Sequence, residues 1–262
     1  MTRIGFFDSG LGGLSVLRQA IRLLPNADFL YAADSGHAPY GNRPPDWVRE
    51  RSLYIAHLLR DQGVAALVIA CNTATALAAE TIRAHLDIPV IAMEPAIKPG
   101  CALSRTGHVG VLATATTLES ERYLELKRRY ADAVQLFEYA PHHWIEAIES
   151  GDHLEPEFAA QLRLDLEPLT KKNIDTWVLA CTHFPLLEAD IRSAVGKGAR
   201  IVDPAAAVSA ELLRRLPQAG EGGEESAGST RLRFLTSGDA ERMQHLARLY
   251  LPPVDLSLES FS

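Results

Sequence analysis

Residues 65–76, AALVIACNTATA, contain a short apolar run that ends at a cysteine. The run at residues 67–70 is too short for a helix and rich in branched side chains, which predicts a strand buried on both faces of a parallel sheet. Cys71 then lies at the carboxyl end of that strand, where open α/β sheets bind their ligands. Asn72 and Thr73 add polar groups at the start of the next helix. This stretch therefore predicts an α/β fold in which a thiol faces a ligand site.

The same pattern returns in residues 175–187, DTWVLACTHFPLL, where a second apolar run ends at Cys181. Another pair of similar segments, residues 4–9 (IGFFDS) and 109–114 (VGVLAT), is separated by nearly the same distance along the chain. Two matches at a similar offset indicate an internal duplication. Each copy would hold one strand-end cysteine.

The duplication predicts two α/β domains with mainly parallel sheets, related by a pseudo-twofold axis. We expect the first domain to comprise residues 1–95 plus 208–262 and the second residues 96–207. Domains placed face to face would bring the two cysteines to one interdomain cleft from opposite sides. This arrangement suits chemistry on both faces of a single carbon atom.

The composition limits the classes of partner and compartment. With a net charge of −7 and a pI near 5.7, the chain has no electrostatic footprint for nucleic acid. The first residues lead into an expected strand without a secretory signal, and no apolar run approaches the length of a membrane span. We therefore expect a cytoplasmic protein with no membrane contact. In reducing cytosol its three cysteines are expected to be free thiols, and without a Cys-x-x-Cys pattern no structural zinc site is expected.

Apolar runs and the turn residues between them set the expected secondary structure. Besides the runs before Cys71 and Cys181, strands are expected at residues 4–7, 28–33, 88–93, 109–113, 135–140, 200–202 and 231–236. Helices are expected before Pro25 and over residues 44–62, 75–85, 155–173, 187–195, 203–216 and 239–250. The last strand and helix are expected to return to the first domain. Residues 34–45 are expected to be a functional loop at a strand end, and the Gly, Ser and Glu of residues 218–229 predict a mobile loop.

Two other groups are expected to take no part in function. Cys101 lies in the linker between the halves and lacks the polar context of the other two cysteines. His142 and His143 are adjacent in the chain, and adjacent histidines seldom bind one metal ion, so we expect them on the surface.

Five segments, in this order, resemble the glutamate racemases of the cofactor-independent aspartate/glutamate racemase superfamily. They are residues 7–16 (FDSGLGGLSV), 33–41 (ADSGHAPYG), 70–76 (ACNTATA), 94–95 (EP) and 180–187 (ACTHFPLL). The resemblance covers nearly the whole chain except the loop at residues 218–229. Ala180 and Phe184 stand where the family usually has Gly and Tyr.

The resemblance implies an enzyme that interconverts L- and D-glutamate by 1,1-proton transfer without a cofactor or metal. Cys71 would take the proton from the D-enantiomer and Cys181 from the L-enantiomer. Asp8, His183 and Glu149 would assist these transfers. The family's substrate-binding residues match Ser9, Pro39, Tyr40, Gly41, Asn72, Thr73, Thr117 and Thr182. The resemblance also implies a homodimer, with glutamate as its small-molecule partner, that supplies D-glutamate for peptidoglycan synthesis.

The chemistry explains why two thiols would be used. Inversion of an α-carbon removes a weakly acidic proton from one face and delivers another to the opposite face, which requires two acid/base groups. The pKa of a free thiol, ~8.5, falls beside a helix N-terminus or a protonated histidine, so one cysteine can be a thiolate while the other remains a thiol. We expect backbone amides, rather than an arginine, to bind the carboxylate and stabilise the carbanion.

Three alternative functions remain open. An aspartate racemase would share the chemistry and differ in the depth of the cleft. A binding or regulatory protein would keep the fold without turnover, although the presence of both cysteines argues against it. A cysteine hydrolase would use Cys181 with His183, but it leaves Cys71 unexplained, and a histidine two residues along the chain is expected to be poorly placed as a base. Two of the candidate catalytic residues also have a purely structural interpretation. Glu149 could be a solvated charge at a helix end, and Asp8 could be a helix N-cap.

Overall fold

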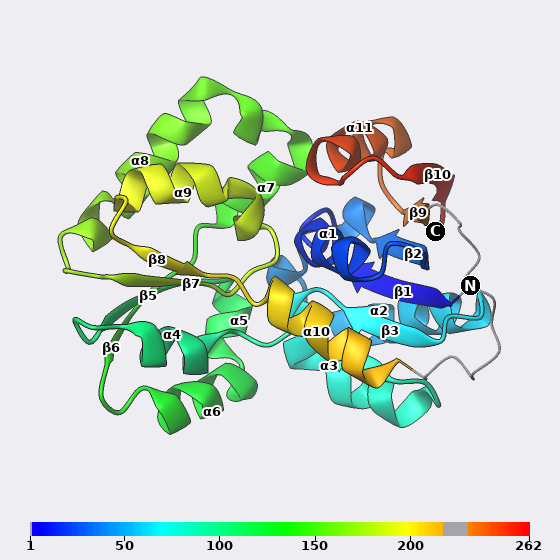
Figure 1. Ribbon diagram of the computed structural model, residues 1–262, viewed down its shortest axis with the longest axis horizontal. Coiled ribbons are helices and arrows are strands. Elements are labelled where there is room, and N and C mark those ends of the chain that lie inside the picture. Colours follow the sequence, from blue (N-terminus) through cyan, green and yellow to red (C-terminus); the bar gives the residue numbers. More distant parts are fainter. Residues whose placement is uncertain (1, 217–229) are drawn as a thin grey trace. The chain divides into compact units, whose positions relative to one another are not determined.

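The structure of the protein, a computed structural model, describes residues 2–216 and 230–262 (Figure 1). The expected loop at residues 218–229 lies outside the described residues. The chain divides into two compact units: unit 1 comprises Met1–Met93 and Ala205–Ser262, and unit 2 comprises Glu94–Pro204. Each unit contains a parallel sheet flanked by helices, which confirms the predicted α/β class.

In unit 1, the described residues form a parallel sheet of six strands in the order β10-β9-β2-β1-β3-β4. The strands are β1 (Arg3–Asp8), β2 (Asp28–Ala33), β3 (Ala66–Ile69), β4 (Val90–Ala92), β9 (Arg231–Thr236) and β10 (Asp255–Ser260). The helices are α1 (Leu14–Leu23), α2 (Pro45–Asp61), α3 (Asn72–His85), α10 (Ala205–Arg215) and α11 (Ala240–Tyr250), with short 3₁₀ helices η1 (Ser35–His37) and η2 (Tyr40–Asn42). Because β9 pairs with β2, the end of the chain returns to the first unit, as expected.

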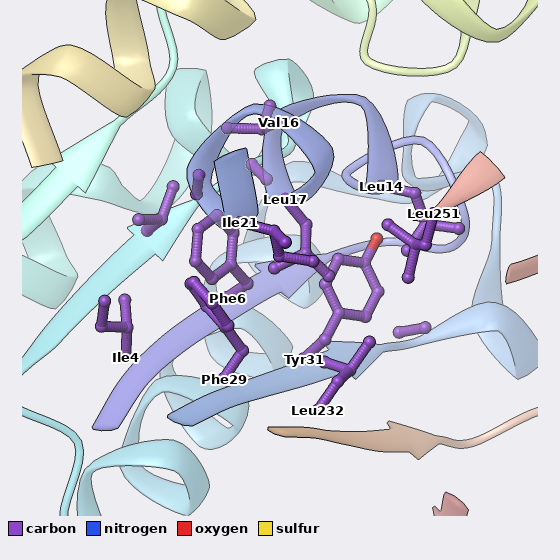
Figure 2. Close-up of a cluster of buried hydrophobic side chains, with 14 of the residues drawn as sticks. Ile4, Phe6, Leu14, Val16, Leu17, Ile21, Phe29, Tyr31, Leu232 and Leu251 are labelled. Atoms are coloured by element: carbon purple, nitrogen blue, oxygen red, sulfur yellow. The ribbon is translucent and has the colours of Figure 1, made fainter. Parts of the chain in front are cut away.

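The central strands β1, β2 and β3 are buried on both faces, which explains their largely apolar sequences. Successive side chains of a strand point to opposite faces. Phe6 and Phe29 belong to the core cluster on the side of α1, α10 and α11, whereas Phe7 and Leu30 belong to the cluster on the side of α2 and α3. Figure 2 shows the first cluster, in which the rings of Phe6 and Phe29 lie close to Ile21 of α1.

In unit 2, the described residues form a parallel sheet of four strands in the order β6-β5-β7-β8. The strands are β5 (His108–Leu112), β6 (Gln135–Tyr139), β7 (Thr176–Leu179) and β8 (Arg200–Val202). The helices are α4 (Ile97–Leu103), α5 (Ala115–Glu119), α6 (Glu121–Tyr130), α7 (His142–Ser150), α8 (Pro156–Thr170) and α9 (Glu188–Val195), with 3₁₀ helices η3 (Asp152–Leu154) and η4 (Phe184–Leu187). Its core has one cluster on the side of α4 and α6 and another on the side of α7, α8 and α9.

The two sheets share one topology. Within each, the unit's first strand in the chain lies between its second and its third, and the fourth lies outside the third: β2-β1-β3-β4 in unit 1 and β6-β5-β7-β8 in unit 2. Cys71 follows β3 and Cys181 follows β7, so each cysteine comes shortly after the third strand of its unit. The shared strand order supports the internal duplication inferred from sequence.

Some elements differ from the expectation. The strands at residues 28–33, 200–202 and 231–236 have the predicted bounds, but β10 and α4 are not among the predicted elements. Residues 34–45, expected to be only a loop, contain η1 and η2, and α3 begins at Asn72 instead of residue 75 because the Cys71 side chain caps it. Among residues 2–216 and 230–262, no helix combines the length and apolar character needed to cross a bilayer.

Candidate active site

The Cys71 cluster of unit 1 consists of Asp8, Ser9, Cys71, Asn72 and Thr73, all buried. Adjacent parallel strands bring these residues together, because β1 ends at Asp8 and β3 ends two residues before Cys71. The Cys71 thiol lies 3.5 Å from the Ser9 hydroxyl, to which it donates, and its sulfur accepts a hydrogen bond from the Ala74 N–H at 3.4 Å. The thiol is therefore located at the N-terminus of α3, where the helix dipole favours negative charge.

Gly13 allows the start of α1 to approach this cluster. A Cβ atom at residue 13 would lie 2.7 Å from the Tyr31 hydroxyl oxygen, 2.8 Å from Asp8 Cβ and 3.0 Å from Ala70 Cβ. Gly13 is also the N-cap residue of α1, so the alternative of Asp8 as that N-cap is wrong. Asp8 Oδ2 instead accepts a hydrogen bond of 2.8 Å from the Gly10 N–H.

Asn72 has a polar group that its surroundings do not satisfy. Its side-chain oxygen and nitrogen are both buried, and neither has a hydrogen-bond partner among the described residues. A buried amide normally finds partners, and leaving one without them costs about 1–3 kcal/mol. An unsatisfied amide next to a strand-end cysteine indicates a place where a polar ligand binds.

The Cys181 cluster of unit 2 consists of Glu149, Cys181, Thr182 and His183. Residues 181–184 form a turn closed by the Phe184 N–H, which donates to the Cys181 carbonyl at 3.2 Å, and η4 begins at Phe184. His183 Nδ1 lies 3.8 Å from Cys181 Sγ, while His183 Nε2 lies 2.6 Å from Glu149 Oε1. The imidazole thus connects the thiol to a carboxylate carried by α7.

The position of His183 corrects two expectations. Because the 181–184 turn folds the chain back, a histidine two residues after the cysteine is within reach of its sulfur, and the argument that it is poorly placed as a base is wrong. Glu149 is not a solvated charge, since its side chain is 13% exposed and contacts a histidine whose side chain is 3% exposed.

The environment of His183 favours its charged form. Burial lowers the pKa of the imidazole, but hydrogen bonds to Cys181 and Glu149 and the attraction of their negative charges outweigh burial and raise the pKa of His183 well above its ordinary value. The side chain can therefore hold a proton at neutral pH and exchange it with the thiol.

Thr117 lies at the same carboxyl edge of the unit 2 sheet. It follows β5, the neighbour of β7, in the first turn of α5. Thr114 caps that helix and accepts the Thr117 N–H at 3.1 Å, while its hydroxyl donates to Thr117 Oγ1 at 2.9 Å. Thr117 and Thr182, the two substrate-binding candidates of unit 2, thus both follow strands at the carboxyl edge of its sheet. Cys101 lies in α4, outside both cysteine clusters, and His142 and His143 are exposed, as expected.

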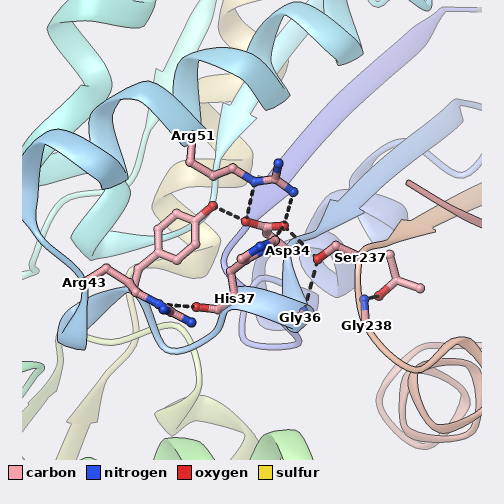
Figure 3. A network of polar contacts seen from close by, with 9 residues as sticks. Asp34, Gly36, His37, Arg43, Arg51, Ser237 and Gly238 are labelled. Atoms are coloured by element: carbon pink, nitrogen blue, oxygen red, sulfur yellow. Dashed lines mark hydrogen bonds and ion pairs between the residues drawn. The ribbon is translucent and has the colours of Figure 1, made fainter. Parts of the chain in front are cut away.

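The residues expected to form a substrate rim, Pro39, Tyr40 and Gly41, lie in the segment after β2. Pro39 and Gly41 are half-buried, but the Tyr40 ring is 1% exposed and its hydroxyl donates to Asp34 Oδ2 at 2.6 Å. Figure 3 shows that Arg51 and Ser237 also bind this carboxylate. Neither residue was a sequence candidate, because an arginine on an amphipathic helix and a serine after a strand carry no local signal.

Nearly the whole chain is similar to proteins of a known family. The family model described as Asp/Glu/Hydantoin racemase matches residues 12–212. The glutamate racemase of Methylococcus capsulatus is 43% identical over 238 residues, which span 91% of this chain and 88% of that protein.

Two solved structures extend the similarity to the fold. The Escherichia coli glutamate racemase in complex with L-glutamate and the activator UDP-MurNAc-ala has a TM-score of 0.88 and 31% identity, covering 100% of this chain and 98% of that one. The glutamate racemase of Francisella tularensis in complex with D-glutamate has a TM-score of 0.81 and 27% identity, covering 100% of this chain and 97% of that one.

Proposed function

Because the chain belongs to the Asp/Glu/hydantoin racemase family, we propose that it interconverts L- and D-glutamate by proton transfer between two cysteines. The observation that carries the proposal is the equivalence of Cys71 and Cys181. Each is a buried thiol that follows the third strand of a sheet with the same strand order, and each has polar partners. The solved relatives with L-glutamate and with D-glutamate are consistent with a substrate of either hand.

In the proposed reaction, one sulfur removes the α-proton and the other replaces it. With D-glutamate, the Cys71 thiolate takes the α-proton, and the electron pair of the broken C–H bond remains on the substrate as a carbanion. The Cys181 thiol then protonates the opposite face, which leaves Cys71 as a thiol and Cys181 as a thiolate. With L-glutamate the two cysteines exchange roles, and no external oxidant, reductant or cofactor is required.

The partners of the two thiols supply the supporting steps. His183 shares a proton with Cys181, and Glu149 holds the other imidazole nitrogen so that Nδ1 faces the sulfur. Asp8 assists on the Cys71 side. The substrate's carboxylate and ammonium groups are bound by Ser9, Asn72, Thr73, Thr117 and Thr182, with the backbone at Pro39, Tyr40 and Gly41 forming the rim. The unsatisfied amide of Asn72 is the most direct support for this assignment.

The cysteine hydrolase is the second candidate, because Cys181, His183 and Glu149 have the arrangement of a nucleophile, a base and its orienting group. The two functions differ in their need for Cys71. Replacement of Cys71 would stop racemisation and leave hydrolysis by Cys181 intact.

The test is proton NMR of L-glutamate, and separately of L-aspartate, in D₂O with the purified protein. We expect the α-proton signal of glutamate and its optical rotation to decay together, and both effects to be lost in Cys71→Ala and Cys181→Ala variants. Cys101→Ala is the matched control and should keep full activity. Exchange on aspartate alone would indicate an aspartate racemase, and no exchange on either amino acid would reject both racemases and leave the binding protein and the cysteine hydrolase.

We further infer that the enzyme is a cytoplasmic homodimer whose D-glutamate supplies peptidoglycan synthesis. Sedimentation equilibrium measures the assembly state. Growth of a D-glutamate auxotroph on expression of the wild-type chain, but not of the Cys71→Ala chain, tests the physiological role.

A further inference from the structure

Asp34 is a buried carboxylate that the proposed chemistry does not use. It follows β2, is 0% exposed, and binds groups from three segments of unit 1 (Figure 3). Arg51 of α2 donates from Nε to Oδ2 at 2.9 Å and from Nη2 to Oδ1 at 2.7 Å. Ser237, between β9 and α11, donates to Oδ1 at 2.7 Å, and the Tyr40 hydroxyl donates to Oδ2.

This carboxylate has no capacity left for a substrate. His37 Nδ1 also lies 3.0 Å from Oδ1, so both oxygens are surrounded by partners. A carboxylate accepts about four hydrogen bonds, and those that Asp34 accepts are charge-assisted or come from hydroxyl groups. Although burial raises the pKa of Asp34, the hydrogen bonds from Arg51, Tyr40, Ser237 and His37 outweigh it and lower the pKa. Asp34 therefore remains charged and acts on other protein groups.

The same contacts fix the segment that precedes the expected rim. The Gly36 N–H donates to Ser237 Oγ at 3.1 Å, and a Cβ atom at Gly36 would lie 2.6 Å from the Ser237 carbonyl oxygen. A Cβ atom at Gly238 would lie 2.9 Å from Ser35 Cβ. Residues 35–37 are thus in close contact with the turn between β9 and α11, while Tyr40 is tied to Asp34.

Arg51 is held in place from its other side. Its guanidinium lies over the rings of Tyr54 and Phe261, at 5.1 and 5.6 Å from the ring centroids. A planar guanidinium that both stacks on rings and binds a carboxylate with two N–H groups has little rotational freedom. The rigid pair of Asp34 and Arg51 therefore holds the Tyr40 side chain, which belongs to the expected rim, in one position.

We propose that Asp34 and Arg51 are positioning residues that control substrate affinity through the backbone of residues 39–41. They touch neither the substrate nor the reacting atoms. This inference rests on the proposed function, because it assumes that residues 39–41 form the rim of a glutamate site.

The test is the steady-state kinetics of glutamate racemisation by Arg51→Gln, Arg51→Lys and Ser237→Ala, with Arg60→Gln as the control on the same helix. Arg60 pairs with the exposed side chain of Asp61 at the end of α2. For Arg51→Gln we expect KM to rise about tenfold while kcat changes less than about threefold, which is the signature of lost binding without lost chemistry. Lysine keeps the charge but not the two-pronged geometry, so Arg51→Lys should fall between wild type and Arg51→Gln. Arg60→Gln should match wild type.

A folded Arg51→Gln protein with wild-type KM, or one in which kcat falls and KM does not change, would overturn the inference. If Arg51→Gln does not fold, the Ser237→Ala variant provides the test. We then expect its KM to rise about threefold with little change in kcat, and an unchanged KM would overturn the inference. The wild-type measurement separates the two proposals. If the wild-type chain does not racemise glutamate, the proposed function fails and this inference fails with it, whereas an active wild type with unaffected variants rejects this inference alone.

Discussion

At the scale of single residues, the two thiols have different partners. The Cys71 sulfur contacts a hydroxyl group and a backbone amide, whereas the Cys181 sulfur faces an imidazole that is bound to a carboxylate. The His183–Glu149 pair makes the chemistry of Cys181 sensitive to pH and to substitution. Glu149 is the residue at which this can be tested without removing a thiol.

Glu149→Gln should lower the pKa of His183, because the variant loses the negative charge that helps to raise it. We expect kcat/KM to fall about tenfold. This is less than the loss expected on removal of a general acid–base group itself, because Glu149 only supports His183. The pKa is measured by NMR titration of the imidazole protons in wild type and variant. An unchanged His183 titration in Glu149→Gln would contradict the assigned hydrogen bond.

The same pair has a defined effect on stability. A group whose pKa is raised by folding contributes its full stability below its unfolded pKa, and loses that contribution as the pH rises through the folded value. The difference in free energy of unfolding between wild type and Glu149→Gln should therefore be largest below pH 6.5, the ordinary value for histidine, and should shrink at higher pH. Urea denaturation at several pH values measures it.

At the scale of elements, close contacts between glycines and large side chains set the packing of unit 2. A Cβ atom at Gly110 of β5 would lie 2.5 Å from Cε3 of Trp177 in β7, and Trp177 is completely buried. Neither the ring nor the strands can move without disturbing the core, since protein interiors are close-packed.

Gly110→Ala should therefore lower the free energy of unfolding by about 2 kcal/mol, as other overpacking substitutions do. Gly198→Ala is the matched control, because nothing lies within 4 Å of a Cβ atom at that residue. Urea denaturation followed by tryptophan fluorescence compares the two variants. Equal stabilities would show that β5 and β7 are not packed as described.

The elements also show why sequence alone predicts some features and not others. Residues 28–33 are buried throughout, and the continuous apolar run at residues 29–33 marks the strand clearly. β10 is an edge strand in which every side chain is exposed or half-buried, and its alternation after Pro253 is too weak to predict a strand. Local pattern places strand-end residues such as Cys71 and Asp8, but the pairing of Arg51 with Asp34 arises from the tertiary fold and leaves no pattern in the sequence.

At the scale of the whole molecule, thermodynamics constrains the two directions of the reaction. L- and D-glutamate have equal free energies in water, so the equilibrium constant between them is one. The values of kcat/KM measured from either enantiomer must therefore be equal, although the environments of Cys71 and Cys181 differ.

We expect equal kcat/KM for L- and D-glutamate in wild type, and the same fractional loss in both directions for Glu149→Gln. Circular dichroism of glutamate, started from each pure enantiomer, measures both directions. A loss confined to one direction of kcat/KM would violate the equilibrium and rule out simple racemisation as the reaction observed.

The strand order shared by the two units also bears on the ancestry of the chain. A single ancestral unit of this topology would have carried one thiol, and the proposed mechanism needs two. In a symmetric dimer of identical subunits, every substitution occurs in both subunits. Fusion of two such genes, by contrast, gives one copy of each half per chain. Each half could then evolve alone. The additional strands β9 and β10 in unit 1, and the His183–Glu149 pair in unit 2, are such differences between the halves.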